Sequence, residues 1–374
     1  MSKKLKIVVG MSGGVDSSVT AALLKEQGHE VIGMFMKNWE EKDENGVCTT
    51  AADFSDVESV CNKLDIPFYA IDFVKEYWDN VFVHFLKEYE MGHTPNPDIL
   101  CNREIKFKVF FEKAMKLGAD YLATGHYAQT ENGKLLKAVD NNKDQTYFLY
   151  AVKEEVLKKV LFPVGNLPKS EVRRIAKKYD LTTADKKDST GICFIGERNF
   201  RQFLSNYLKE KPGKFVTPEG RVVGEHKGAV FYTSGQRKGL GIGGMKDSTG
   251  ESWFVADKNI ADNTVTVVQG EMHPALYADE LTATEISWIG AAPVEVPFHC
   301  TAKVRYRQTD QECTVTKIEG DRMWVSFKTP QRAITIRQSI VLYQDNVCLG
   351  GAMIESHGPT YFEMKKSLPQ VVSI

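Results

Sequence analysis

The sequence lacks the features that mark membrane proteins, metal-cluster proteins and strongly basic nucleic-acid-binding proteins. No apolar run reaches the roughly 18 residues that a membrane helix needs. None of the seven cysteines has a second cysteine two to four residues away, so we expect no zinc or iron–sulfur site. Positive charge is not in excess, because 48 Lys and Arg stand against 49 Asp and Glu. That balance argues against a nucleic-acid partner unless basic side chains gather on one surface.

The amino-terminal end also lacks a secretory signal. Its first apolar run, Ile7–Val9, is too short for a signal-peptide core, and no small-residue cleavage site follows. We therefore expect a cytoplasmic protein without membrane association, in which structural disulfides are disfavoured. The length of 374 residues and the hydrophobic content of 42% are those of two or three globular domains.

The first 125 residues alternate short apolar runs with helical patterns. Strands are expected at 6–10, 31–36, 68–73 and 121–124, and helices at 15–27, 51–64, 75–89 and 105–117. Because β–α repetition places strands in parallel with helices on both faces, we predict an α/β fold with a Rossmann-like parallel sheet.

The rest of the chain changes character twice. Residues 167–211 read as mostly helical, residues 216–254 are rich in glycine, and from Thr264 onward apolar and polar residues alternate with period two. We predict an α/β domain with a basic helical extension at 1–205, a small central β-rich module at 206–277, and a C-terminal antiparallel β-barrel at 278–374.

A glycine-rich segment, Gly10-Met-Ser-Gly-Gly-Val-Asp-Ser17, separates the first strand from the first helix. This is where an α/β sheet binds anions, because backbone N–H groups and the helix N-terminus face the ligand. A carboxylate at Asp16 would repel phosphate unless a divalent cation lay between them, so we expect Mg²⁺ with the nucleotide. The segment has neither the lysine of a Walker loop nor the spacing of a dinucleotide fold. A capped turn would explain two glycines alone, but the full string resembles the PP-loop ATP pyrophosphatases.

Cys101 follows Thr94-Pro-Asn-Pro97 and precedes the helix expected at 105–117. A thiolate is stabilised at a helix N-terminus, and Arg103 would help, whereas Asp98 would oppose it. Asp98 could instead move protons to or from a substrate. The alternative is a buried cysteine beside a helix cap.

Cys193 lies between Gly191 and Gly196, with Lys186 and Lys187 nearby. Two flanking glycines suit a flexible or strained loop. The alternative here is a buried thiol packed between its apolar neighbours.

Taken together, these segments resemble the tRNA-specific 2-thiouridylases. The matching segments are Met11-Ser-Gly-Gly-Val-Asp-Ser17, Phe35-Met-Lys-Asn-Trp39, Gly92-His-Thr-Pro-Asn-Pro-Asp-Ile-Leu-Cys-Asn102, Ala123-Thr-Gly-His-Tyr127, Lys143-Asp-Gln-Thr-Tyr-Phe-Leu149, Ser189-Thr-Gly-Ile-Cys-Phe-Ile-Gly196 and Thr233-Ser-Gly-Gln-Arg-Lys-Gly-Leu240. They occur in the family's order, from about residue 5 to about residue 360.

The resemblance implies ATP-dependent 2-thiolation of the wobble uridine (U34) of tRNA. Uridine O2 would be adenylated and then replaced by sulfur from a cysteine persulfide, giving 2-thiouridine, AMP and diphosphate. It also implies as partners the anticodon stem-loop of the tRNAs for Lys, Glu and Gln, and a persulfide sulfur-carrier protein or cysteine desulfurase. We expect the chain to act as a monomer, with ATP and Mg²⁺.

The family's site residues carry over onto matching positions. The resemblance implies that Cys193 carries the persulfide, that Cys101 resolves it and that Asp98 is the acid or base. ATP would bind at Gly10, Met11, Ser12, Gly13, Gly14, Val15, Asp16, Ser17, Met36 and Gly125. The tRNA would be bound by Asn96, Pro97, Asp98, His126, Lys143, Asp144, Gln145, Arg305, Tyr306 and Gln338.

Two positions depart from the family pattern. Ile336-Arg337 stands where a Pro-Gly usually precedes the Gln338 equivalent, and Asp180 stands where a glycine is common. Asp tolerates the left-handed conformation that a helix C-terminus favours, so we expect a small cost at Asp180.

Two other function classes remain open: an amide-forming ligase on the same PP-loop fold, and a non-catalytic nucleotide-regulated RNA-binding protein. The distribution of charge favours RNA. Residues 163–214 carry twelve Lys or Arg against six Asp or Glu, and residues 301–340 carry eight against four. Solvated faces would also explain such runs, but with the thiolation motifs we predict two phosphate-binding surfaces beside an ATP site.

Overall fold

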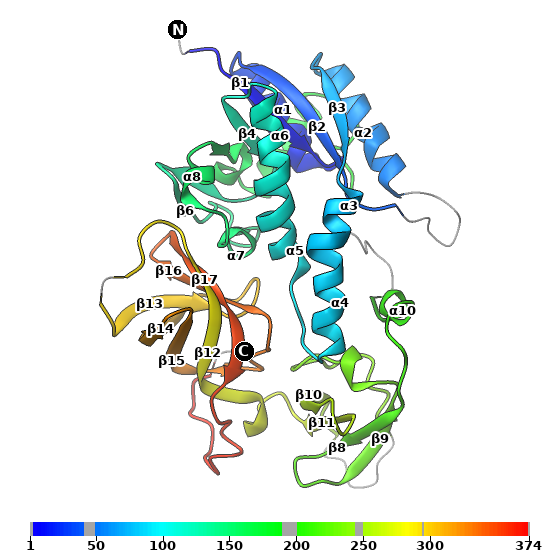
Figure 1. Ribbon diagram of the computed structural model, residues 1–374, viewed down its shortest axis with the longest axis vertical. Coiled ribbons are helices and arrows are strands. Elements are labelled where there is room, and N and C mark those ends of the chain that lie inside the picture. The colour runs from blue at the N-terminus through cyan, green and yellow to red at the C-terminus, as the bar shows by residue number, and fades with distance from the viewer. Residues whose placement is uncertain (1–2, 41–48, 189–199, 244–249, 294, 373–374) are drawn as a thin grey trace.

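The structure is a computed structural model, and it describes residues 3–40, 49–188, 200–243, 250–293 and 295–372. Three parts are distinguished in Figure 1: a parallel sheet with its helices, a small β-rich module, and a β-barrel that carries the C-terminal end. The predicted fold class is confirmed in all three parts.

A five-stranded parallel sheet, in the order β3-β2-β1-β4-β7, organises the N-terminal part. Its strands are β1 (Lys6–Met11), β2 (Glu30–Lys37), β3 (Phe68–Asp72), β4 (Tyr121–Thr124) and β7 (Val160–Leu161). The four strands predicted from the sequence are present, and β7 was not predicted. Because β1 is buried on both faces, Ile7 and Val9 pack into one core and Val8 into the other.

Helices cover both faces of this sheet. One face carries α1 (Val15–Glu26), α2 (Thr49–Lys63) and α9 (Lys169–Lys178). The other carries two long helical rods, seen side by side in Figure 1. The first rod is α3 (Val74–Tyr77), the π-helix η1 (Trp78–Phe82) and α4 (Val83–Glu90). The second is α5 (Pro97–Leu100), the π-helix η2 (Cys101–Phe110) and α6 (Phe111–Lys116).

The second rod corrects the prediction of a helix at 105–117. Its helical backbone starts at Pro97, so Cys101 lies in the second turn and not at the N-terminus. Proline is compatible with the first helical position, because its missing N–H would have no partner there. Stabilisation of a Cys101 thiolate by the helix dipole is therefore weaker than we predicted, because that effect fades within the first turn.

The basic extension is less helical than predicted within its described residues. It holds α9 and α10 (Phe200–Ser205), with turns between Leu181 and Asp188. The chain before it forms β5 (Gln129–Glu131), β6 (Lys134–Leu136), α7 (Thr146–Leu149), α8 (Glu154–Leu157) and the 3₁₀ helix η3 (Pro163–Asn166).

The central module is a four-stranded sheet in the order β10-β11-β8-β9, around its own small core that includes Phe215, Val255 and Val265. Its elements are β8 (Gly213–Val216), β9 (Val222–His226), the 3₁₀ helix η4 (Ala229–Phe231), β10 (Trp253–Asn259) and β11 (Thr264–Gln269).

The C-terminal part is a closed antiparallel barrel of six strands, because β12 pairs with both β15 and β17. After the 3₁₀ helix η5 (Pro274–Leu276) come β12 (Tyr277–Trp288), β13 (Phe298–Lys303), β14 (Gln311–Glu319), β15 (Arg322–Arg332), β16 (Ser339–Gln344) and β17 (Val347–His357). Strand β17 also pairs with β6, which joins the barrel to the N-terminal part.

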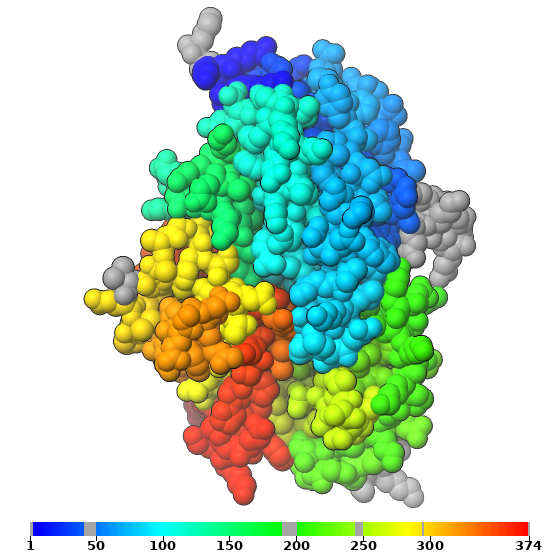
Figure 2. All heavy atoms as spheres, viewed as in Figure 1, coloured from blue at the N-terminus to red at the C-terminus, as the bar shows by residue number. Residues whose placement is uncertain are grey.

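The surface view in Figure 2 shows the helical rods in blue and cyan directly against the orange and red barrel. Across the described ranges, every helix is too short or too polar to cross a membrane.

Candidate functional site

The glycine-rich loop lies at the carboxyl edge of the parallel sheet, between β1 and α1. Gly13 has φ of +72°, and a Cβ there would lie 2.6 Å from the backbone oxygen of Asp53. Ser17 Oγ donates to the Gly14 carbonyl at 3.0 Å and accepts from the Ser12 amide at 3.2 Å. The loop is thus fixed in shape by its own hydroxyls, and its N-cap is a glycine.

Asp16 is the charged centre of this loop. Its carboxylate accepts from the Tyr127 hydroxyl at 2.9 Å and from Lys169 Nζ at 2.7 and 2.9 Å. Burial, and then the nearby charge of Asp16, raise the pKa of Tyr127 well above its ordinary value, so Tyr127 stays a hydrogen-bond donor. Tyr127 and Lys169, which lie 111 and 153 positions after Asp16, therefore hold its carboxylate in place.

Lys169 also reaches Asp188, at 2.9 Å, and Asp188 is shared with Lys143 at 2.7 Å and Arg173 at 2.8 Å. Burial alone would raise the pKa of Asp188, but hydrogen bonds from Lys143 and Lys169 outweigh it and lower that pKa to about 2. The segment that leads toward Cys193 is therefore anchored beside the nucleotide loop.

Lys186 gives this segment a second anchor, because its Nζ donates to the Gly13 carbonyl at 3.0 Å and pairs with Asp53 and Asp56 on α2. Cys193 and its motif, residues 189–196, lie outside the described residues.

The residues of the loop fit an ATP polyphosphate. Gly13 and Gly125 form a cradle that side chains would fill, since a Cβ at Gly125 would lie 2.6 Å from the Ser17 amide. Met36 ends up at the carboxyl edge of β2, beside the loop, because Phe35 pairs with Met11. In the described part of the chain no three His, Cys, Asp or Glu side chains are placed to hold a metal ion alone. A Mg²⁺ held at Asp16 would complete its shell with phosphate oxygens and water, as this ion usually does.

The Pro-Asn-Pro-Asp segment forms the start of the second rod. Asn96 is the N-cap of α5, and its Oδ1 accepts from the Asp98 amide at 3.1 Å. Asp98 and Cys101 are three residues apart and so share one helix face. Asp98 is half-buried, whereas Cys101 is 0% exposed. On this helix face the predicted acid or base, Asp98, is therefore closer to solvent than the predicted nucleophile, Cys101.

The same rod contacts the nucleotide loop at its other end. A Cβ at Gly10 would lie 3.4 Å from the Phe110 ring. Phe107 breaks the helical backbone inside η2, and such π-helical segments are frequent at functional sites. One helix thus connects Cys101 with the predicted ATP site.

His126 packs beside this break. Its ring lies 5.7 Å from that of Phe107, and its Nδ1 lies 2.7 Å from Thr124 Oγ1. Burial, and then the charge of Lys106, lower the pKa of His126 well below its ordinary value, so the imidazole is neutral. A contact of His126 with tRNA would therefore rest on hydrogen bonding and stacking.

The predicted tRNA-binding segment 143–145 has internal partners in this structure. Lys143 pairs with Asp188, Asp144 accepts from the Ala138 amide and the Thr146 hydroxyl, and Gln145 Oε1 accepts from the Tyr127 amide. Asp144 is buried. These contacts order the segment around the Asp16 network, and its contact with tRNA stays a prediction.

Arg305 and Tyr306 join the barrel to the other two parts. The Arg305 guanidinium donates to the carbonyls of Ser234 and Ala333 at 2.9 and 2.7 Å. The Tyr306 ring packs 4.4 Å from that of Phe148, whose carbonyl accepts from Asn102. Both side chains are therefore committed to internal contacts here, and their contact with tRNA stays a prediction.

Gln338 faces the predicted substrate loop, because its Nε2 donates to the Thr94 carbonyl at 2.7 Å. The neighbouring Arg337 pairs with Glu88 at 2.8 Å. This places the departure at Ile336-Arg337 against the Pro-Asn-Pro-Asp segment.

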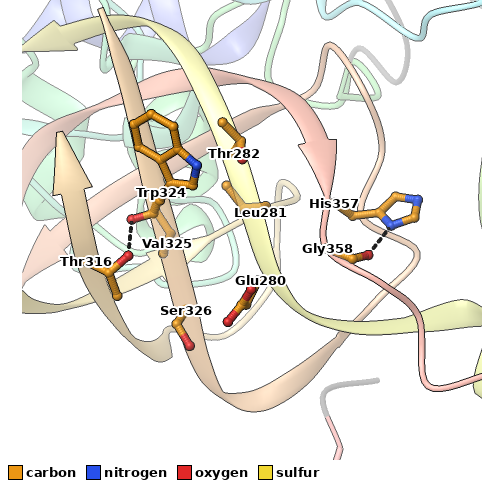
Figure 3. A pocket seen from close by; sticks show the side chains of 9 residues that line it. All are labelled: Glu280, Leu281, Thr282, Thr316, Trp324, Val325, Ser326, His357 and Gly358. Carbon is orange, nitrogen blue, oxygen red and sulfur yellow. Dashed lines mark hydrogen bonds between the residues drawn. The ribbon is translucent and has the colours of Figure 1, made fainter. Parts of the chain in front are cut away.

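A pocket of about 120 Å³ lies apart from these residues, on the barrel. Figure 3 shows its lining side chains, which include Glu280, Trp324 and His357 from β12, β15 and β17. None of the predicted site residues lines it, so we place the candidate site at the sheet edge and the second rod.

Three family models match consecutive parts of the chain. They are the tRNA methyl transferase HUP domain at residues 5–197, the tRNA methyl transferase PRC-barrel domain at 201–269 and the aminomethyltransferase beta-barrel domain at 278–354. Full-length relatives carry a different name. A tRNA-specific 2-thiouridylase MnmA of Protochlamydia amoebophila is 59% identical over 374 residues, which cover 99% of this chain and 98% of the relative. The chain belongs to the tRNA-specific 2-thiouridylase family.

A second relative with the same name, from Staphylococcus carnosus, is 58% identical over 355 residues, covering 94% of this chain and 95% of its own length. One from Proteus mirabilis is 56% identical over 356 residues, covering 94% and 97%. Membership of the thiouridylase family confirms the resemblance that the motifs predicted.

Several side chains around the site were not predicted for their roles. Lys169 was counted only within a basic surface, Tyr127 was only part of a motif, and Glu88 was not singled out at all. Asn102, next to Cys101, is 2% exposed, and among the described residues its Oδ1 has no hydrogen-bond partner. The sequence feature that could have pointed to Asn102 is its position as a polar residue next to Cys101.

Proposed function

We propose that this chain catalyses ATP-dependent 2-thiolation of the wobble uridine (U34) of tRNA. The observation that carries the proposal is the near full-length identity with 2-thiouridylases. The geometry supports it in two ways. The segment leading to Cys193 is held against the anion-binding loop by Lys186, and the helical rod that starts with Asp98 and Cys101 reaches Gly10 of the same loop through Phe110 at its other end.

The first step uses the nucleotide loop. Uridine O2 bonds to the α-phosphorus of ATP, the bond between the α- and β-phosphates breaks, and diphosphate leaves. Backbone amides at the start of α1 and the charge of Lys169 offset the negative charge of the phosphates. Asp16 would hold a Mg²⁺, which when bound supplies positive charge beside the phosphates.

The second step uses the cysteines. The terminal sulfur of a Cys193 persulfide bonds to C2 of the uridine, the C2–O bond breaks and AMP leaves. Cys101, as a thiolate, attacks the inner sulfur of Cys193 and frees the transferred sulfur, which leaves a Cys101–Cys193 disulfide for an external thiol to reduce. Asp98 takes or gives the proton at this helix face.

The burial of Cys101 fits this division of roles. A thiol with no exposed surface is closed to a sulfur-carrier protein in this conformation. In this proposal Cys193 is then the acceptor of external sulfur, and Cys101 resolves the persulfide. The target base leaves the anticodon stack to reach such a site.

The finer assignments belong to the same proposal. The substrates are the tRNAs for Lys, Glu and Gln, the donor is a persulfide sulfur-carrier protein or a cysteine desulfurase, and the enzyme is a cytoplasmic monomer. Residues 1–205 form the ATP-binding catalytic domain, 206–277 the central module and 278–374 the tRNA-binding domain. The tRNA is bound by Asn96–Asp98, His126, Lys143–Gln145, Arg305, Tyr306 and Gln338.

The test is mass spectrometry of the wobble nucleoside after incubation with unmodified tRNA, ATP, Mg²⁺ and a persulfide donor. We expect 2-thiouridine together with AMP and diphosphate. Unchanged uridine alongside AMP release would favour the ligase alternative, and tRNA binding without ATP cleavage would favour the binding-protein alternative.

Cysteine variants make this test specific. Cys101→Ser and Cys193→Ser should each lower thiolation by more than ~100-fold while tRNA binding is retained. Cys300→Ser, at a partly exposed cysteine of the barrel, is the matched control and should leave the rate unchanged. Full activity in either of the first two variants would exclude the sulfur relay.

A further inference from the structure

A buried ion-pair cluster links the first helical rod to the barrel. Glu88 on α4 is 2% exposed, and its carboxylate accepts from Arg337 Nε at 2.9 Å and Nη2 at 2.8 Å. His93 Nδ1 lies 2.6 Å from the same carboxylate, and Arg337 Nη1 donates to Glu285 on β12 at 2.8 Å.

The backbone at this cluster is strained. Arg337 has φ of +67° and Glu285 has φ of +54°, both in the left-handed region that favours glycine. Residues persist in such conformations when the surrounding structure fixes them, and they gather at functional sites. At Arg337, the fixing structure is the two-pronged contact with a buried carboxylate, which a glycine could not make.

The same barrel segment holds the loop that enters the second rod. The Thr94 amide donates to the Ile336 carbonyl at 3.3 Å, and Gln338 Nε2 donates to the Thr94 carbonyl at 2.7 Å. Thr94 Oγ1 lies 3.2 Å from Thr233 Oγ1 of the central module. All three parts of the molecule therefore meet at Thr94.

The distance along the chain from this junction to the site is short. His93, which contacts Glu88, is three residues before Asn96, the N-cap of the helix that carries Asp98 and Cys101. Pro95 and Pro97 restrict the backbone between these points. We therefore expect a displacement of residues 93–94 to move Asn96 as well.

We propose that the Glu88–Arg337 pair is a positioning device that fixes residues 93–98 against the barrel. Asn96, Asp98 and Cys101 then contact the substrate base in one fixed arrangement. The inference rests on the proposed function, since it assigns this loop to the base of the tRNA. Arg337 and Glu88 act through the loop and are positioning residues, not catalytic ones.

Kinetics of Arg337→Gly and Glu88→Gln test the proposal. Glycine accepts the left-handed backbone, so Arg337→Gly removes the side chain without adding strain. In single-turnover thiolation we expect each variant to be ~10-fold slower, because a displacement of this kind costs rate, while the Kd for tRNA changes less than ~2-fold. Arg337→Lys, which keeps one charged contact, should recover part of the rate. Glu312→Gln is the matched control, since Glu312 forms an exposed ion pair on the same barrel.

A double-mutant cycle shows whether the two residues act together. The rate of the double variant should equal that of either single variant, because each change breaks the same pair. The proposal would be overturned if the rate reductions of the two single variants multiplied in the double variant.

Alkylation of cysteines supplies a readout that does not need the reaction. Cys101, Cys61 and Cys348 are all buried, but Cys101 follows residues 93–98 on the second rod, whereas Cys61 lies on α2 and Cys348 in the barrel. In Arg337→Gly, site-resolved mass spectrometry should show Cys101 alkylated ~10-fold faster, with Cys61 and Cys348 unchanged. Faster labelling of all three would show general destabilisation and overturn the proposal, as would unchanged labelling of Cys101.

The two readouts separate this proposal from the proposed function. Selective exposure of Cys101 in a protein that never thiolates tRNA would uphold the positioning pair and reject the reaction. Normal thiolation and normal labelling in both variants would reject the positioning pair and leave the reaction standing.

Discussion

Two basic side chains each bridge two acidic ones, in regions of opposite character. Lys169 connects Asp16 of the nucleotide loop to Asp188, and both carboxylates keep 30% of their side-chain surface exposed. Arg337 connects Glu285 to Glu88, and Glu88 keeps only 2%. We call the first bridge, whose two carboxylates are partly exposed, the open bridge. We call the second the closed bridge because Glu88 is buried, although its Glu285 end keeps 43% of its side-chain surface exposed.

The difference in the exposure of their carboxylates indicates that the two bridges have different roles. The two carboxylates of the open bridge are partly exposed, so water can solvate them when Lys169 turns from a carboxylate to a phosphate. A buried pair cannot lose one member without leaving an uncompensated charge. We therefore expect changes at Lys169 to affect the reaction first, and changes at Arg337 to affect stability as well as rate.

The largest expected effect is that of Lys169→Met. This variant keeps much of the apolar stem but leaves Asp16 and Asp188 without their shared cation at an anion-binding site. We expect kcat/KM for ATP to fall by ~10²–10³-fold, measured by AMP release with saturating tRNA. Lys63→Met, at an exposed ion pair with Asp180, is the control and should change it less than ~2-fold. A Lys169→Met enzyme with normal ATP kinetics would contradict the assignment of an exchangeable bridge.

The next effect is on stability, in Arg337→Gly. The change relieves a strained backbone but leaves the buried Glu88 carboxylate with two histidines as neighbours, His93 at 2.6 Å and His84 at 3.8 Å. Breaking a buried pair costs about 3 kcal/mol, which corresponds to a Tm lower by roughly 6–12 °C in scanning calorimetry. Lys169→Met should lower Tm by less than half as much, and equal losses would remove the contrast between the two bridges.

The sequence predicted well the features that depend on residues close together in the chain. The strands at 6–10 and 121–124 and the glycine-rich loop follow from short-range patterns, and the structure has them. The loop could be assigned to phosphate because its glycines and helix N-terminus are neighbours in the chain. The prediction started the second rod at residue 105, which is too late, because Pro97 occupies a first helical position with which proline is compatible.

The partners across the fold could not be predicted in the same way. Asp16 and Lys169 are separated by 153 positions, and Glu88 and Arg337 by 249. Nothing local marks such a pair, because each member alone resembles an ordinary surface charge. At Ile336-Arg337 the departure from the family pattern was visible, but the carboxylate that compensates for it was not.

The pH dependence of stability gives a smaller effect at the open bridge. Lysine hydrogen bonds lower the pKa of Asp188 to about 2, below its unfolded value of about 4. A lowered folded pKa stabilises the protein above pH 4, and this stabilisation is lost as the pH falls from 4 to 2. Asp188→Asn should therefore be less stable than the parent at pH 7, by about 1–2 kcal/mol after solvent screening, and the gap in Tm should close between pH 4 and pH 2. A gap that stays constant over this window would show that Asp188 is not held by its cations.

The smallest effect is expected for Asp180→Gly, which should change Tm in the direction opposite to Arg337→Gly. Asp180 also stands where the family has glycine, and its φ of +50° confirms the left-handed backbone predicted after α9. Its ion pair with Lys63 is solvent-exposed, so it compensates little for the strain. Asp180→Gly should raise Tm by about 1–2 °C, whereas Arg337→Gly lowers it. Both variants place a glycine at a residue with left-handed backbone, so calorimetry of the two side by side compares an exposed ion-pair partner with a buried one. If both raised Tm, the Glu88–Arg337 pair would contribute no stability, and the closed bridge would differ from the open one in exposure alone.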